Sequence, residues 1–225
     1  MKWKGRRSST NVSDKRGQTV ARTAGAGVIL NLVGRTFGMK GILWLVGIVA
    51  VLWVTGLVDP STFLGGGVQT RDEPYQATPG EQERFDFVTV VLADTEDVWT
   101  EEFRKRGADY RVPQLTIYTD ATQTACGMGQ AAMGPFYCPG DQTIYVDLGF
   151  YDELEQTFRA PGDFAQAYVI AHEVGHHVQN LLGTSDKVHR MRGRPDYNEW
   201  SVRLELQADF YAGVWARQNQ EYLDR

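Results

Sequence analysis

Two histidines and a glutamate lie together in the run His172-Glu173-Val174-Gly175-His176. On a helix, side chains four residues apart lie on one face, so His172 and His176 can reach the same ion. Imidazole nitrogen is a common ligand of Zn²⁺. Glu173 can take a proton from water on the metal and later pass it to a leaving amine. The run predicts a helix that binds zinc in the active site of an enzyme that hydrolyses peptide bonds. The alternative is that the two histidines lie in the core or on the surface and bind no metal.

A catalytic zinc needs a third protein ligand and an open fourth position. Glu205 and Asp209 are candidates, because they are four residues apart and share one face of a helix. Glu205 could bind the metal while Asp209 accepts a hydrogen bond from a ligand histidine. The alternative is a solvated acidic face. His177 points about 100° away from His176 around the helix, whereas His189 lies in a polar stretch, where it could bind metal or steady the oxyanion.

Apolar periodicity predicts the elements that position these residues. Three helices and two strands are expected, in the order helix, strand, strand, helix, helix, at residues 85–106, 114–118, 143–148, 163–182 and 198–218. Residues 184–197 are polar, contain Gly193 and Pro195, and are predicted to be a loop. The fold class is therefore α+β, with helices packed on a small sheet.

An uncharged apolar run of 18 residues, 41–58, precedes this domain. As a helix it would rise about 27 Å, roughly one hydrocarbon core. A buried core helix usually has a polar face, and a cleaved signal peptide has a shorter apolar region followed by a small-residue cleavage site, so we favour an uncleaved transmembrane anchor. Lys and Arg cluster before the run, which predicts a cytoplasmic N-terminus and places residues 59–225 outside the membrane.

Charge is distributed unevenly about this run. Residues 1–40 hold nine Lys and Arg against one acid, and residues 41–225 hold 14 against 27 acids. An acidic body argues against a nucleic-acid partner, and a basic segment beside an apolar run favours anionic lipid. We expect residues 1–40 to be a cytoplasmic tail, disordered over 1–24, and residues 59–84 to be a linker to a domain at 85–225.

Cys126 and Cys138 are the only cysteines and lie 12 residues apart in a Gly-rich stretch. An extracytoplasmic pair of this kind usually forms a disulfide. A metal site would need more Cys or His nearby, and all four histidines lie downstream. A cytoplasmic domain with a regulatory role would instead keep free thiols.

His172–His176, followed by Glu205 and Asp209, resembles the pattern of the gluzincin zinc peptidases. In these enzymes H-E-x-x-H is followed by a helix that carries a ligand Glu and a supporting Asp. The chain is more closely similar to the bacterial "putative neutral zinc metallopeptidase" family. The similar stretches are Trp3–Arg7, Val90–Trp99, Ala125–Gly129, Gly134–Pro139, Ile144–Asp147, Ala171–His177 and Ser201–Asp209.

This resemblance implies a zincin fold, a single N-terminal anchor and a Cys126–Cys138 bridge. It also implies Glu205 as third ligand and Asp209 as its supporting carboxylate. Members of that family continue several dozen residues past the last helix, which implies that the domain at 85–225 is a C-terminally shortened form.

The chain is therefore predicted to be a zinc metallopeptidase that acts on peptide or protein substrates outside the cytoplasmic membrane. Residues 41–58 are predicted to anchor it in the membrane lipid. The strand at 143–148, or the segment between the cysteines, is expected to pair with an extended substrate. The alternative is a membrane-tethered zinc-binding scaffold or inactive pseudopeptidase. Its metal would be closed in by four protein ligands, with His189 or Asp209 in the fourth place.

Overall fold

The computed structural model describes residues 1–18, 75–157, 159 and 162–223. The chain divides into two units, one made of Met1–Gly17 with Glu73–Arg225 and the other of Gln18–Asp72. The described helices and strands all belong to the first unit.

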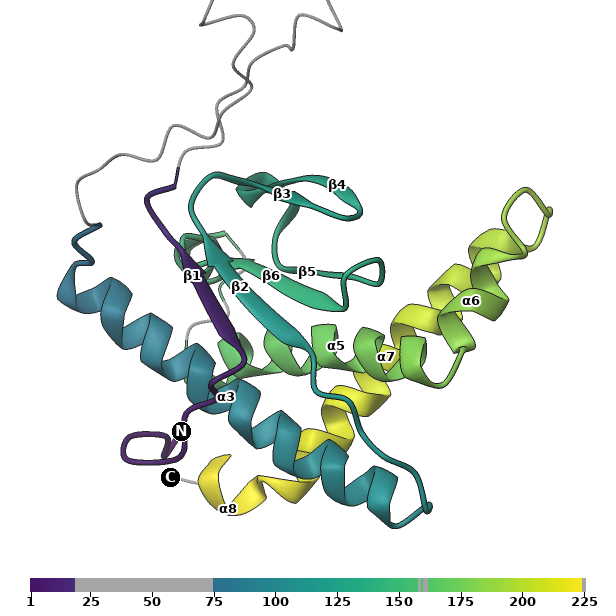
Figure 1. Ribbon diagram of the computed structural model, residues 1–225, viewed down its shortest axis with the longest axis horizontal. Coiled ribbons are helices and arrows are strands. Elements are labelled where there is room, and N and C mark those ends of the chain that lie inside the picture. Colours follow the sequence, from purple (N-terminus) through teal and green to yellow (C-terminus); the bar gives the residue numbers. More distant parts are fainter. Residues whose placement is uncertain (19–74, 158, 160–161, 224–225) are drawn as a thin grey trace, which may run out of the picture. The chain divides into compact units, whose positions relative to one another are not determined.

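This unit contains a four-stranded sheet, in the order β1-β2-β6-β5, with the long helices below it in the view of Figure 1. Its strands are β1 (Val12–Lys15), β2 (Gln114–Tyr118), β6 (Thr143–Asp147) and β5 (Phe136–Cys138). The first three are parallel, and β5 is antiparallel to β6. Strands covered on both faces carry nearly continuous apolar runs, and the apolar side chains of β2 and β6 are buried accordingly. A separate hairpin pairs β3 (Ala121–Thr124) with β4 (Gly127–Gln130).

Three long helices pack with the sheet and contact one another (Figure 1). They are α3 (Pro79–Arg104), α5 (Asp163–Leu181) and α7 (Tyr197–Gln218). Thr78 caps α3, because its hydroxyl accepts from the Glu81 N–H while the Glu81 carboxylate accepts from the Thr78 N–H. The predicted α+β class, the three helices and the two strands are thus confirmed.

Shorter elements depart from the prediction. Within the stretch predicted to be a loop, α6 covers Thr184–His189, after Gly183 adopts a left-handed conformation with φ of 70°. Two other short α-helices were not predicted, α4 (Phe150–Gln156) and α8 (Gln220–Leu223), nor was the 3₁₀ helix η1 (Ala131–Met133). The predicted Cys126–Cys138 disulfide is present and ties the β3–β4 turn to β5.

The N-terminal segment belongs to the folded unit, which corrects the prediction of a disordered tail. β1 pairs with β2, Val12 lying opposite Leu115. Upstream, the Arg6 guanidinium donates to the Asp94 carboxylate at 2.6 Å, and Arg7 donates to Glu96 at 2.9 Å. The domain therefore includes residues 1–17, and the predicted linker at 59–84 is too long, because α3 already begins at residue 79.

The contact between Arg6 and Asp94 gives a test of this segment. Asp94 is only 4% exposed, so an Arg6→Ala variant would leave a buried charge without its partner. We expect the free energy of unfolding to fall by about 3 kcal/mol, measured by urea denaturation. Lys4→Ala, which removes an exposed ion pair with Glu83, is the control and should leave stability unchanged. Equal stability of both variants would contradict a docked N-terminal segment.

The predicted single-pass membrane location is also corrected. The run at residues 41–58 lies outside the described residues, and in the part of the chain that the structure describes no helix is both long and apolar enough to cross a bilayer. Moreover, β1 precedes that run and β2 follows it, yet the two strands pair in one sheet. A single crossing between them would put them on opposite sides of the membrane.

Candidate metal centre

The close packing of α5 on α7 brings the predicted site residues together. Gly175, in the middle of the His-Glu motif, makes this possible, because a Cβ built on it would lie 2.9 Å from the Ala208 carbonyl oxygen and 3.1 Å from the Ala208 Cα. Any larger residue would have to push α7 away. The two helices therefore meet where the motif faces Glu205 and Asp209.

Three candidate ligand atoms converge at this contact. The Nε2 atoms of His172 and His176 lie 3.4 and 3.2 Å from Oε2 of Glu205. One ligand atom from each of the three residues lies within 4.8 Å of the others, a group that could hold a metal ion. Two atoms bound tetrahedrally to one zinc at 2.0–2.1 Å would be about 3.3 Å apart. The His₂Glu donor set and its spacing therefore fit Zn²⁺.

Asp209 orients the first histidine. Its Oδ1 lies 2.9 Å from Nδ1 of His172 and accepts a second hydrogen bond from the Tyr168 hydroxyl at 2.7 Å. A carboxylate can only accept, so Nδ1 of His172 carries the proton and Nε2 keeps its lone pair for the metal side. The hydrogen bond from Tyr168, and then that from His172, lowers the pKa of Asp209 below its ordinary value.

Glu173 is buried beside these groups, with 8% of its surface exposed. Burial, followed by the nearby charge of Glu205, raises its pKa to about 8 in the metal-free protein, although a hydrogen bond from the Tyr137 backbone N–H acts in the opposite direction. Tyr137 is the middle residue of β5, so the edge strand of the sheet lies directly against the motif.

The other two histidines lie outside this cluster. His177 is fully buried; its Nε2 donates to the Arg111 carbonyl at 2.6 Å, and its Nδ1 accepts from the Tyr137 hydroxyl at 3.0 Å. It therefore ties α5 to β5 and to the chain before β2. His189 is exposed at the end of α6, and neither histidine belongs to the group of three that the described residues offer a metal.

Sequence reasoning missed three polar residues of the site. Tyr168 lies one turn before His172 on the same helix face, and Gln179 lies three residues after His176, so helical spacing could have identified both. Tyr137 gave no local signal, because its place beside Glu173 depends on the pairing of β5 with β6.

The tight contact at Gly175 leads to a mutational prediction. Gly175→Ala should force α5 and α7 apart, lower the free energy of unfolding by about 1–3 kcal/mol and weaken zinc binding. Gly213→Ala on α7 is the matched control, because a Cβ there meets no atom within 4 Å; it should stabilise the helix by about 0.5–1 kcal/mol. Calorimetry with and without zinc measures both effects. A Gly175→Ala variant as stable as wild type would show that the helices do not meet this closely.

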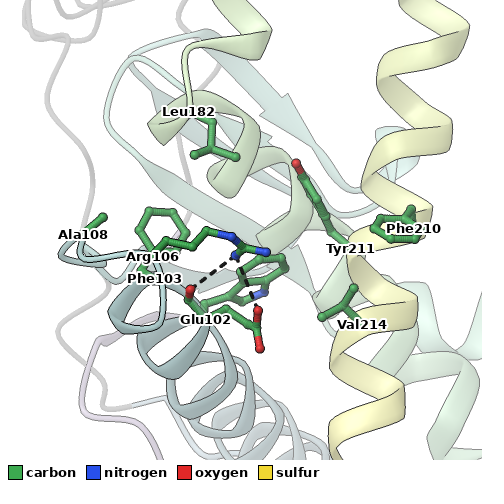
Figure 2. A pocket seen from close by; sticks show the side chains of 9 residues that line it. Glu102, Phe103, Arg106, Ala108, Leu182, Phe210, Tyr211 and Val214 are labelled. Atoms are coloured by element: carbon green, nitrogen blue, oxygen red, sulfur yellow. Dashed lines mark hydrogen bonds and ion pairs between the residues drawn. The ribbon is translucent and has the colours of Figure 1, made fainter.

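An apolar pocket of about 420 Å³ lies elsewhere, between α3, the end of α5 and α7 (Figure 2). Its lining residues are Trp99, Glu102, Phe103, Arg106, Ala108, Leu182, Phe210, Tyr211 and Val214. None of them is a candidate metal ligand or base. The pocket is therefore separate from the candidate metal centre.

Comparison with known proteins places this chain in a family. The model of the family described as "Putative neutral zinc metallopeptidase" matches residues 1–224. The uncharacterized protein YpfJ of Escherichia coli K12 is 43% identical over 227 residues, which cover 98% of this chain and 76% of YpfJ. The uncharacterized protein Rv2575 of Mycobacterium tuberculosis is 45% identical over 108 residues, 48% of this chain and 36% of Rv2575. No solved structure matches. The chain therefore belongs to the family described as "Putative neutral zinc metallopeptidase".

Proposed function

We propose that this chain is a zinc-dependent peptidase of the zincin type, with a gluzincin arrangement of ligands. The observation that carries the proposal is the convergence of both histidine Nε2 atoms on the carboxylate of Glu205, with Glu173 buried beside them. Zinc held there by His172, His176 and Glu205 would polarise the scissile carbonyl and lower the pKa of the attacking water.

Glu173 is the proposed base and acid. Its carboxylate takes a proton from the attacking water, holds it in a buried position and gives it to the nitrogen of the leaving amine. The Tyr137 backbone N–H lies beside this carboxylate, in the edge strand β5. Asp209 and Tyr168 keep the His172 ring in place while this proton moves.

The edge strand β5 is the proposed platform for an extended peptide. β6 is paired by β2 on one side and by β5 on the other, so the segment 143–148 has no free edge for a substrate strand. β5 is the end strand of the sheet in the described residues, and its Tyr137 lies beside Glu173. A peptide added along this edge would place its backbone next to the metal ligands.

The geometry argues against the closed site of a scaffold protein. Asp209 contacts Nδ1 of His172, the ring nitrogen opposite the metal side, and is therefore occupied as a hydrogen-bond acceptor. His189 lies outside the ligand group. These contacts support a site in which the described residues supply three protein ligands and water or substrate takes the fourth position.

Casein cleavage by the purified, zinc-loaded protein tests this proposal. Treatment with 1,10-phenanthroline should abolish cleavage by removing the metal, and added zinc should restore it. The isomer 1,7-phenanthroline, which cannot chelate zinc, is the matched control and should have no effect. Cleavage that resists 1,10-phenanthroline would contradict a zinc peptidase.

A further inference from the structure

Gln179 is a fully buried polar residue on α5, one turn beyond the metal motif. A buried amide is costly unless its donors and acceptor are all satisfied. Its Oε1 lies 3.0 Å from Nδ1 of His176, and its Nε2 lies 2.6 Å from the Leu204 carbonyl and 3.1 Å from Oε1 of Gln207. Every polar atom of the Gln179 side chain is therefore used, and its partners lie on both helices of the site.

These partners fix which way the amide points. The carbonyl oxygen of Leu204 can only accept a hydrogen bond, so the nitrogen of Gln179 must face it. The oxygen of the amide then faces His176, and Nδ1 of His176 must carry the proton. The lone pair of His176 is left on Nε2, the atom that lies 3.2 Å from Glu205.

The Gln179 side-chain amide also contacts α7, the helix that carries the third candidate ligand, Glu205. Leu204 directly precedes Glu205 in α7, so the hydrogen bond from Gln179 holds the backbone of α7 next to this residue. Gly175 and Ala208 form a second contact between the two helices one turn away. Gln179 thus acts on His176 through its oxygen and on the position of Glu205 through its nitrogen.

We propose that Gln179 is a positioning residue of the metal centre, which selects the metal-binding tautomer of His176 and sets the distance between the two ligand helices. This inference rests on the proposed metal site and deepens it. Asp209 accepts a hydrogen bond from Nδ1 of His172, as Gln179 does from Nδ1 of His176. Asp209 lies on α7, however, whereas Gln179 lies on α5, the helix that also carries both histidines. The two histidines are therefore oriented by different side chains and from different helices.

The tautomer of His176 in the metal-free wild-type protein gives the first test. Long-range ¹H–¹⁵N correlation spectra distinguish a protonated Nδ1 from a protonated Nε2, and a His176→Gln variant assigns the signals. We expect a proton on Nδ1 of His176 before any metal is added. An Nδ1 without a proton would overturn the proposal, whatever the state of Nε2, and this test requires no substitution of Gln179.

A Gln179→Met variant gives the second test, because methionine fills a similar volume without an N–H donor or a strong acceptor. Zinc affinity, measured by competition with a chromophoric chelator, should weaken about 10- to 100-fold. The visible spectrum of the Co²⁺-loaded protein should also change, since it reports ligand geometry. Gln207→Leu removes only one hydrogen bond to Gln179 and is the comparison; it should weaken zinc binding less than about threefold on the same scale.

Zinc affinity and a Co²⁺ spectrum like those of wild type in Gln179→Met would show that Gln179 merely fills the core. If this variant fails to fold, the tautomer measurement decides alone. Both readouts are independent of peptide cleavage. If both readouts give the expected results but the wild-type protein cleaves no peptide, the role of Gln179 stands and the proposed peptidase function is contradicted.

Discussion

Glu173→Gln is expected to bind zinc as wild type does and to lose about 10³-fold in kcat for peptide cleavage. Glutamine has nearly the same shape but cannot take up a proton, so the attacking water loses its base. Glu173 is outside the group of three candidate ligands, which explains why zinc should be retained. Cleavage of a fluorogenic casein and zinc content are to be measured on the same preparations.

The matched control is Glu153→Gln, the same chemical change at an exposed position on α4. It should leave both cleavage and zinc content unchanged. A Glu173→Gln variant that cleaves within tenfold of wild type would remove Glu173 from the mechanism. A variant that loses zinc together with activity would instead make Glu173 part of the binding site.

Glu205→Ala is expected to weaken zinc binding by more than about 100-fold, beyond the effect of losing a group that only supports a ligand. Oε2 of Glu205 lies close to the Nε2 atoms of both histidines. The substitution therefore leaves two of the three candidate metal ligands. Zinc should therefore no longer raise the melting temperature, because this stabilisation depends on binding to the folded state.

Glu199→Ala is the control for Glu205→Ala. Glu199 lies on the same helix and is exposed, and it pairs with Arg203 rather than with a site residue. Zinc titration by calorimetry should give one high-affinity site in this variant and none in Glu205→Ala. One tightly bound zinc per chain in Glu205→Ala would mean that another residue is the third ligand.

The local parts of the site could be predicted from the sequence. His172, Glu173 and His176 lie within one turn of a helix whose apolar periodicity is clear, and the structure places that helix at Asp163–Leu181. Glu205 and Asp209 could be paired by their spacing, because four residues on a helix define a face. Which atoms of these two helices meet depends on their packing at Gly175, which spacing alone does not give.

The N-terminal segment shows where local patterns fail. Residues 1–17 are polar and basic, a composition typical of a disordered tail. Their partners, Asp94 and Glu96, are buried acids on α3 far along the chain, and no local pattern links the two. The predicted membrane location was wrong for a related reason. Hydropathy describes only the run at residues 41–58, whereas the pairing of β1 with β2 depends on residues before and after that run.

The position of zinc in the protein tests the central claim most directly. An anomalous difference map at the zinc absorption edge, from crystals grown with zinc, is predicted to show one peak held by Nε2 of His172, Nε2 of His176 and the Glu205 carboxylate, with the fourth position free of protein. A peak elsewhere, or a fourth protein ligand such as Asp209 or His189, would contradict a catalytic zinc at this site.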